Sequence, residues 1–130
     1  MKKKIKDIYN WDKIDNPETN LLKQINSIID KTPDDLTCSD ICLLLRQEMF
    51  LDIVIPKAII EIENNPKVGD FYDFQMLVNL SSISEQLIPY KEKVRELITV
   101  LEEKAKKIVF ELDSDKDDFN SSIKTLKQII

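Results

Sequence analysis

The stretch ICLLLRQEMFLDIVIPKAIIEIENNPKVGDFYD, residues 41–73, is the most apolar run of the chain, and its pattern decides the fold. From Leu51 onward the apolar residues recur at the 3.6-residue period of a helix, at Val54, Ile55, Ala58, Ile59 and Ile62. Pro66 and Gly69 then break the period. The stretch therefore predicts a helix that begins near Leu51 and ends before Pro66.

Two further helices are predicted before this one. Thr37 is a suitable N-cap with Asp40 at the third helical position, as in a capping box, for a helix that RQEMF ends or bends. Earlier, Asn16 is predicted to cap a helix that starts at Pro17 and stops near Lys31. The apolar stripe of that helix consists of Leu21, Leu22, Ile25, Ile28 and Ile29.

The residues after the stretch predict helices as well. Asp73 is the expected cap of one helix and Ser84 of the next, which runs long, from Ile88 to Glu111, with Pro89 near its start. The run DSDKDD, residues 113–118, is expected to be an acidic loop before a last helix. With a short helix around Ile5, Ile8 and Tyr9, these elements predict an all-α fold. We expect residues 1–130 to form a single-domain irregular bundle of about six or seven helices, in which residues 1–15 could pack loosely.

Composition and charge limit the partners. The 130 residues carry a net charge of −5, but the first 13 hold five lysines against two aspartates, so residues 14–130 carry −8. With only two arginines the chain lacks the basic stripe that nucleic acid requires, whereas a basic protein would be attracted. No apolar run is long enough for a membrane span or a secretory signal. We therefore expect a cytoplasmic protein with a protein partner and no nucleic-acid or membrane partner.

The sequence offers little for catalysis. It has no histidine, and its single glycine excludes a glycine-rich phosphate loop. Asp113, Asp115 and Asp117 resemble the start of a calcium loop, but Asp118 and Lys124 stand where that loop requires glycine and glutamate. Cys38 and Cys42, one helical turn apart, are expected to be reduced core residues. We expect no enzyme activity, no metal and no cofactor.

Residues 34–80 carry a set of residues in an order and spacing that resembles the immunity proteins of bacterial contact-dependent growth inhibition systems. The set consists of Arg46, Gln47, Leu51, Pro56, Ala58, Asn65, Pro66, Gly69 and Tyr72. The resemblance implies a cytoplasmic protein that binds and neutralises one cognate toxin domain, the delivered carboxy-terminal part of a large surface effector and often a nuclease. The alternative is a helical adaptor or regulatory domain that docks a partner helix through residues 88–111. The oligomeric state stays open.

The acidic residues are the predicted toxin contacts, in two clusters. One consists of Asp34, Asp35, Asp70 and Asp73, and the other of Asp113, Asp115, Asp117 and Asp118. Trp11, Tyr72 and Tyr90 are either interface anchors or half-buried core residues.

Seven residues of the family pattern are expected to be structural: Arg46, Gln47, Pro56, Asn65, Pro66, Gly69 and Tyr72. Arg46 is predicted to tie Asp70 or Asp73 to the end of its helix, because its planar guanidinium can grip a carboxylate. Pro56 is predicted to bend the third helix or to mark its true start.

Overall fold

The computed structural model describes residues 3–130, and all regular structure within that range is helical. This confirms the predicted all-α fold. The α-helices are α1 (Ile5–Ile8), α2 (Asn20–Ile29), α3 (Cys38–Gln47), α4 (Leu51–Asn64), α5 (Gln75–Ser81), α6 (Lys91–Ala105) and α7 (Asp113–Lys127). Two 3₁₀ helices, η1 (Pro33–Asp35) and η2 (Ser84–Tyr90), precede α3 and α6.

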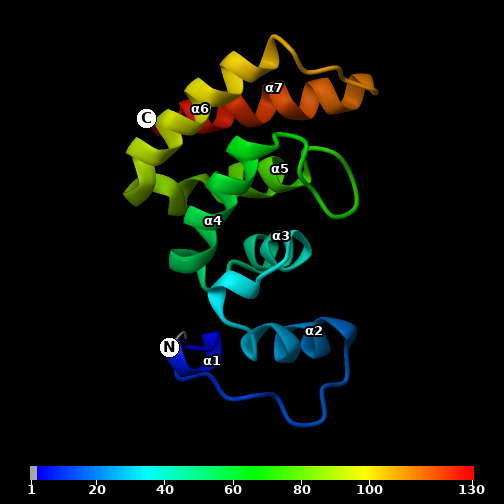
Figure 1. Ribbon diagram of the computed structural model, residues 1–130, viewed down its shortest axis with the longest axis vertical. Helices are drawn as coiled ribbons and strands as arrows, with labels where there is room; N and C mark the ends of the chain where they lie inside the picture. Colours follow the sequence, from blue (N-terminus) through cyan, green and yellow to red (C-terminus); the bar gives the residue numbers. More distant parts are fainter. Residues whose placement is uncertain (1–2) are drawn as a thin grey trace.

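The helices form a long molecule with α1 and α2 at one end and α6 and α7 at the other (Figure 1). Between them, α4 packs against α3, α5 and α6, while α7 packs against α5 and α6. The apolar stripe predicted for α4 is the part of that helix that is buried: Val54, Ile55, Ala58, Ile59 and Ile62. Burial of this stripe joins the two ends of the bundle to its centre.

The start of α3 follows the predicted capping box. The Thr37 hydroxyl accepts a hydrogen bond from the Asp40 amide at 3.1 Å, and the Asp40 carboxylate accepts one from the Thr37 amide at 3.0 Å. The stretch RQEMF ends this helix, as predicted, because Glu48 and Phe50 both adopt left-handed backbone conformations. Pro56 lies inside α4, five residues after its start, so the prediction that it marks the start is wrong.

The predicted start of α2 is also wrong. The helix begins at Asn20, with the Thr19 hydroxyl accepting from the Leu22 amide at 3.1 Å. Asn16, the predicted cap, turns the chain in a left-handed conformation with φ 51°. The Asn26 side chain donates to the Ile14 carbonyl and accepts from the Ile14 amide, both at 2.9 Å. These bonds hold residues 14–19 alongside α2 instead of within it.

Four later predictions differ from the structure. Phe74, not Asp73, precedes α5, and Ser84 begins a 3₁₀ helix. The long helix is limited to Lys91–Ala105, because Pro89 has no amide hydrogen to donate within an α-helix. The expected acidic loop is the first part of α7. Its aspartates suit this place because carboxylates interact favourably with the positive end of the helix dipole.

Gly69 lies in a tight connection between α4 and α5. A Cβ atom at this position would stand 2.2 Å from the Tyr72 carbonyl oxygen and 2.8 Å from the Gln75 Cβ. The nearest of these atoms belongs to the backbone and has no rotamer to change. The close approach of the chain to itself thus requires glycine here.

The amino-terminal segment docks on α2 and α4. The buried Ile5 donates from its amide to the Lys31 carbonyl at 2.9 Å. The rings of Tyr9 and Trp11 lie 4.7 and 5.3 Å from the ring of Phe50, measured between centroids. Lys6 and Lys13 both pair with Asp30, at the end of α2. The first two residues of the predicted loose segment, 1–15, lie outside the described residues.

Gly69→Ala should destabilise the fold, since the added methyl group must displace the Tyr72 backbone. We expect the free energy of unfolding to fall by about 2–3 kcal/mol in a urea titration. Asn64→Ala, at the exposed last residue of α4, is the control and should change it by less than about 0.5 kcal/mol. Equal stabilities of the two variants would contradict the assigned role of Gly69.

Acid should release the amino-terminal segment before the rest of the fold. Hydrogen bonds from Lys13 and Lys6 lower the pKa of the Asp30 carboxyl below its ordinary 3.8. Because the folded-state pKa is the lower one, the pairing stabilises docking above about pH 4 and is lost as the pH falls further. The emission of Trp11, the single tryptophan, should therefore shift to the red at a higher pH than the far-ultraviolet helix signal is lost.

Asp30→Asn should show the red-shifted emission already at neutral pH. Asp12→Asn, an exposed aspartate of the same segment, should behave as the unmodified chain does. A single transition seen at the same pH by both signals would mean that the segment does not open separately.

Candidate functional site

Three phenylalanine rings bring together parts of the chain that are distant in sequence. Phe74 lies just before α5, Phe110 in the connection from α6 to α7, and Phe119 within α7. Their ring centroids lie 5.4 Å apart for Phe74 and Phe110, and 5.5 Å apart for the other two pairs. In addition, the Lys67 ammonium donates to the Val109 carbonyl at 2.7 Å. The loop of residues 69–74, the loop of residues 106–112 and α7 therefore share one surface (Figure 1).

Gln75 fixes the shape of the 69–74 loop. Its side chain is buried, and its carbonyl oxygen accepts hydrogen bonds from the amides of Asp70 and Phe71, both at 2.7 Å. The Phe74 amide donates to the Lys67 carbonyl at 3.0 Å, and the Met76 amide donates to the Val68 carbonyl at 3.1 Å. Sequence reasoning did not identify Gln75. A polar residue at the start of an apolar helix was the available signal, since a buried amide needs hydrogen-bond partners.

The outer side of this surface is strongly apolar. The exposed fraction is 77% for Phe71 and 46% for Tyr72, both in the 69–74 loop. It is 74% for Val109 and 61% for Leu112, in the neighbouring loop. Of these four residues, only Tyr72 was among the candidates named from the sequence.

Acidic residues from both predicted clusters border these side chains. Asp70 is exposed and accepts a hydrogen bond from the Ser39 hydroxyl at 3.0 Å. Asp73 and Asp118 are half-buried. Burial, and after it the charge of Asp118, raises the pKa of the Tyr72 phenol. The structure thus brings the carboxylate of Asp118, from α7, to the loop that holds Asp70 and Asp73.

The other residues of the second cluster divide between two faces of α7. Asp113 and Asp117 are exposed. Asp115 is only 8% exposed and shares the inward face with Phe119 and Ser122, at the four- and seven-residue spacing of one helix face. Its prediction as a toxin contact is therefore wrong, because a residue turned toward the core has little surface to offer a partner.

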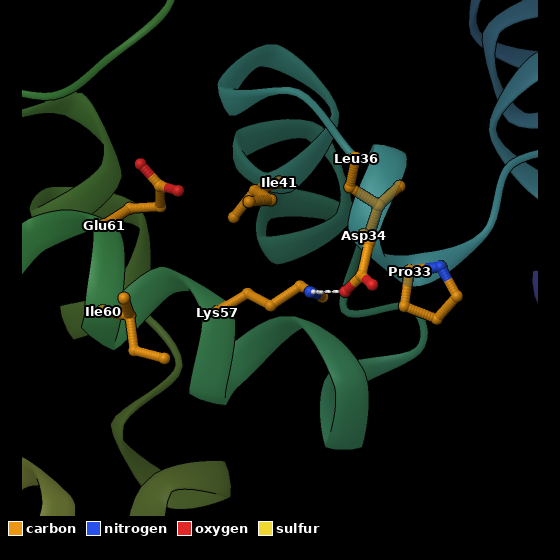
Figure 2. Close-up of a pocket in the computed structure, with 7 residues that line it drawn as sticks. All are labelled: Pro33, Asp34, Leu36, Ile41, Lys57, Ile60 and Glu61. Carbon is orange, nitrogen blue, oxygen red and sulfur yellow. Dashed lines mark hydrogen bonds and ion pairs between the residues drawn. The ribbon is translucent and has the colours of Figure 1, made fainter. Parts of the chain in front are cut away.

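Asp34 and Asp35 lie elsewhere in the molecule, within η1. Asp34 pairs with Lys57 of α4 at 3.4 Å across a small cleft of about 130 Å³ (Figure 2). Leu36, Ile41 and Ile60 supply the apolar part of its lining. Asp35 accepts a hydrogen bond from the Thr32 hydroxyl at 2.9 Å. The charge of Asp34 is thus partly balanced within the chain.

The ion pair predicted for Arg46 is absent from residues 3–130. Arg46 is exposed at the end of α3, and Asp70 bonds to Ser39 instead. The guanidinium lies where its charge acts on Cys42 and Tyr72 and lowers the pKa of both groups, against the larger effect of burial. Arg46 therefore acts on this region through its charge and not through the predicted ion pair with Asp70 or Asp73.

The remaining residues of the family pattern differ in exposure and in local hydrogen bonding. Gln47 is exposed and Pro66 is buried. Asn65 shapes the turn after α4, because its side chain accepts from the Lys67 amide at 3.2 Å and its carbonyl from the Val68 amide at 2.9 Å. Trp11 is partly exposed on the Phe50 ring, and Tyr90 is half-buried against the core.

The chemistry of the described residues is limited. Burial raises the pKa of the Cys42 thiol to about 11 and also raises that of Cys38, so both free thiols stay protonated at neutral pH. No group of three or more cysteine, aspartate and glutamate side chains within residues 3–130 could hold a metal ion. Nor does any helix in that range have the length and apolar character needed to cross a membrane.

A family model described as CDI immunity proteins, where CDI stands for contact-dependent growth inhibition, matches residues 6–98. No curated protein and no solved structure matches the chain. The matched range contains the whole of residues 34–80, on which the resemblance was recognised, and extends it from α1 into α6. Since the match covers well over half of its 130 residues, the chain belongs to the CDI immunity proteins.

Proposed function

We propose that this chain neutralises its toxin by binding the toxin domain directly in the cytoplasm, without catalysis. The domain would be the carboxy-terminal region of a large secreted effector. The observation that carries the proposal is the family match over residues 6–98, because immunity proteins of this family neutralise a toxin. A single cognate toxin is the expected partner.

Charge supports a basic partner and favours a nuclease. Residues 14–130 carry −8, and Lys6 and Lys13 of the basic amino-terminal segment are already paired with Asp30. A nuclease needs a basic cleft to hold phosphates. An acidic protein that occupies or borders such a cleft meets complementary charge, which accelerates association and excludes like-charged partners.

The arrangement of α6 does not favour the alternative of a helix-docking adaptor. Its apolar residues Val94, Leu97, Ile98 and Leu101 are buried within the bundle. Its exposed residues are all polar or charged, from Lys91 to Lys104. A docking groove for an amphipathic helix needs an exposed apolar lining, which this face does not have.

Co-expression with the toxin domain encoded beside its gene should restore growth, and the two chains should purify as a complex. In vitro, cleavage of nucleic acid by that domain should stop when the immunity protein is added in about equimolar amount. Growth rescue without co-purification would contradict direct binding. A toxin domain that is neutralised but cleaves no nucleic acid would contradict the nuclease assignment alone.

The association rate should fall about tenfold or more when sodium chloride is raised from 50 to 500 mM, because salt screens the attraction between an acidic and a basic surface. Stopped-flow mixing with a catalytically inactive toxin domain measures this rate. The dissociation rate, which depends on buried contacts, is the internal control and should change much less. A salt-independent association rate would exclude a basic toxin surface.

A further inference from the structure

We propose that the toxin binds on one particular surface, the Phe71 face, which consists of Asp70, Phe71, Tyr72, Val109, Leu112 and Asp118. Phe71 would be its apolar anchor, inserted into a pocket on a basic surface of the toxin. This inference rests on the proposed function and assigns its contact surface.

The first observation is where the apolar surface gathers. Among residues 3–130, the three large apolar side chains with the greatest exposure are Phe71, Val109 and Leu112. All three come from the two loops that the ring contacts and the Lys67–Val109 hydrogen bond bring together, although these loops are about 40 residues apart in sequence. The contacts among the Phe74, Phe110 and Phe119 rings hold those loops together. Large exposed apolar side chains gathered on neighbouring loops among polar residues are typical of a protein-binding site.

The second observation is that the backbone presenting Phe71 is already ordered. Gln75 accepts hydrogen bonds from the amides of Asp70 and Phe71, and Ser39 donates to the Asp70 carboxylate. The close approach at Gly69 closes the loop from its other end. A toxin that takes up Phe71 therefore has little loop entropy to remove, which is the condition under which one aromatic side chain contributes most to affinity.

The third observation is the charge of the carboxylates that border the apolar side chains, Asp70 and Asp118, which are called the rim below. Neither Asp70 nor Asp118 forms an ion pair with a cation of residues 3–130, and Asp73 lies in the same loop without one. Lys67 lies near both loops and donates to the Val109 carbonyl, and Lys106, in the second loop, pairs with Glu103. Lys107 and Lys116 lie in or beside the second loop, and none of the ion pairs within residues 3–130 joins them or Arg46 to Asp70 or Asp118. The carboxylates are thus left for cations of a partner, so the face fits a basic surface with an apolar pocket.

Phe71→Ala should weaken binding of the inactive toxin domain about 30-fold or more, mainly through faster dissociation in surface plasmon resonance. Ile88→Ala is the matched control, because Ile88 is 53% exposed on η2, at the opposite edge of the molecule from both loops (Figure 1). It should change the affinity less than twofold. Both variants should keep the melting temperature, since both side chains are largely exposed.

The rim carboxylates Asp70 and Asp118 should affect the association rate instead of the dissociation rate. Asp70→Asn combined with Asp118→Asn should slow association about threefold or more at low salt and leave dissociation nearly unchanged. Asparagine at position 70 can still accept the hydrogen bond from Ser39, so the loop should be preserved. Asp34→Asn with Asp35→Asn, in η1, is the charge-matched control and should leave both rates within about twofold.

Unchanged affinity of Phe71→Ala, with the unmodified chain binding normally, would overturn the Phe71 face and leave the proposed function intact. If the Ile88 variant or the Asp34 and Asp35 variant weakens binding more than Phe71→Ala does, the toxin binds at η2 or at η1, and the Phe71 face is likewise overturned. Failure of the unmodified chain to bind the toxin domain would instead refute the proposed function.

Discussion

The contact among Phe74, Phe110 and Phe119 is the constraint on which the rest of this structure depends. These rings join the end of one loop, the middle of another and the inner face of α7. Aromatic pairs at such distances add to the stabilisation gained from burial alone. Without this cluster, α7 would lose its link to the loop before α5, and the surface shared by the two loops would not exist. The core and the proposed contact surface are therefore two sides of one cluster.

Helix positions that depend on local sequence could be predicted, and those that depend on distant contacts could not. The capping box of Thr37 and Asp40 needs only two residues in one turn, and it forms as predicted. The start of α2 instead depends on Asn26, which pairs with the Ile14 backbone from within the helix. Asn16 and Pro17 carried a valid local signal, but this pairing across twelve residues places the segment outside the helix.

The acidic residues show the same division in the candidate site. Their negative charge was evident from composition, but the partners that neutralise or bury individual carboxylates are distant in sequence. Lys57 reaches Asp34 across 23 residues, and packing of α7 turns Asp115 inward. Phe71 was overlooked for a related reason. An aromatic residue in an apolar stretch of sequence is usually part of the core. The turn closed by Gly69 and Gln75 instead leaves Phe71 exposed.

The family match and the proposed surface overlap only in part, and this has a consequence for partner choice. The 69–74 loop lies inside the matched range, whereas Val109, Leu112 and Asp118 lie beyond its end at residue 98. Discrimination between related toxins requires side chains that can change without loss of the fold. Val109 and Leu112 satisfy this condition because they are exposed and stand outside the ring cluster. On the proposed contact surface, Phe71 would therefore belong to the part of the chain that matches the family model, and the adjoining loop beyond residue 98 could change to match one toxin and to exclude others.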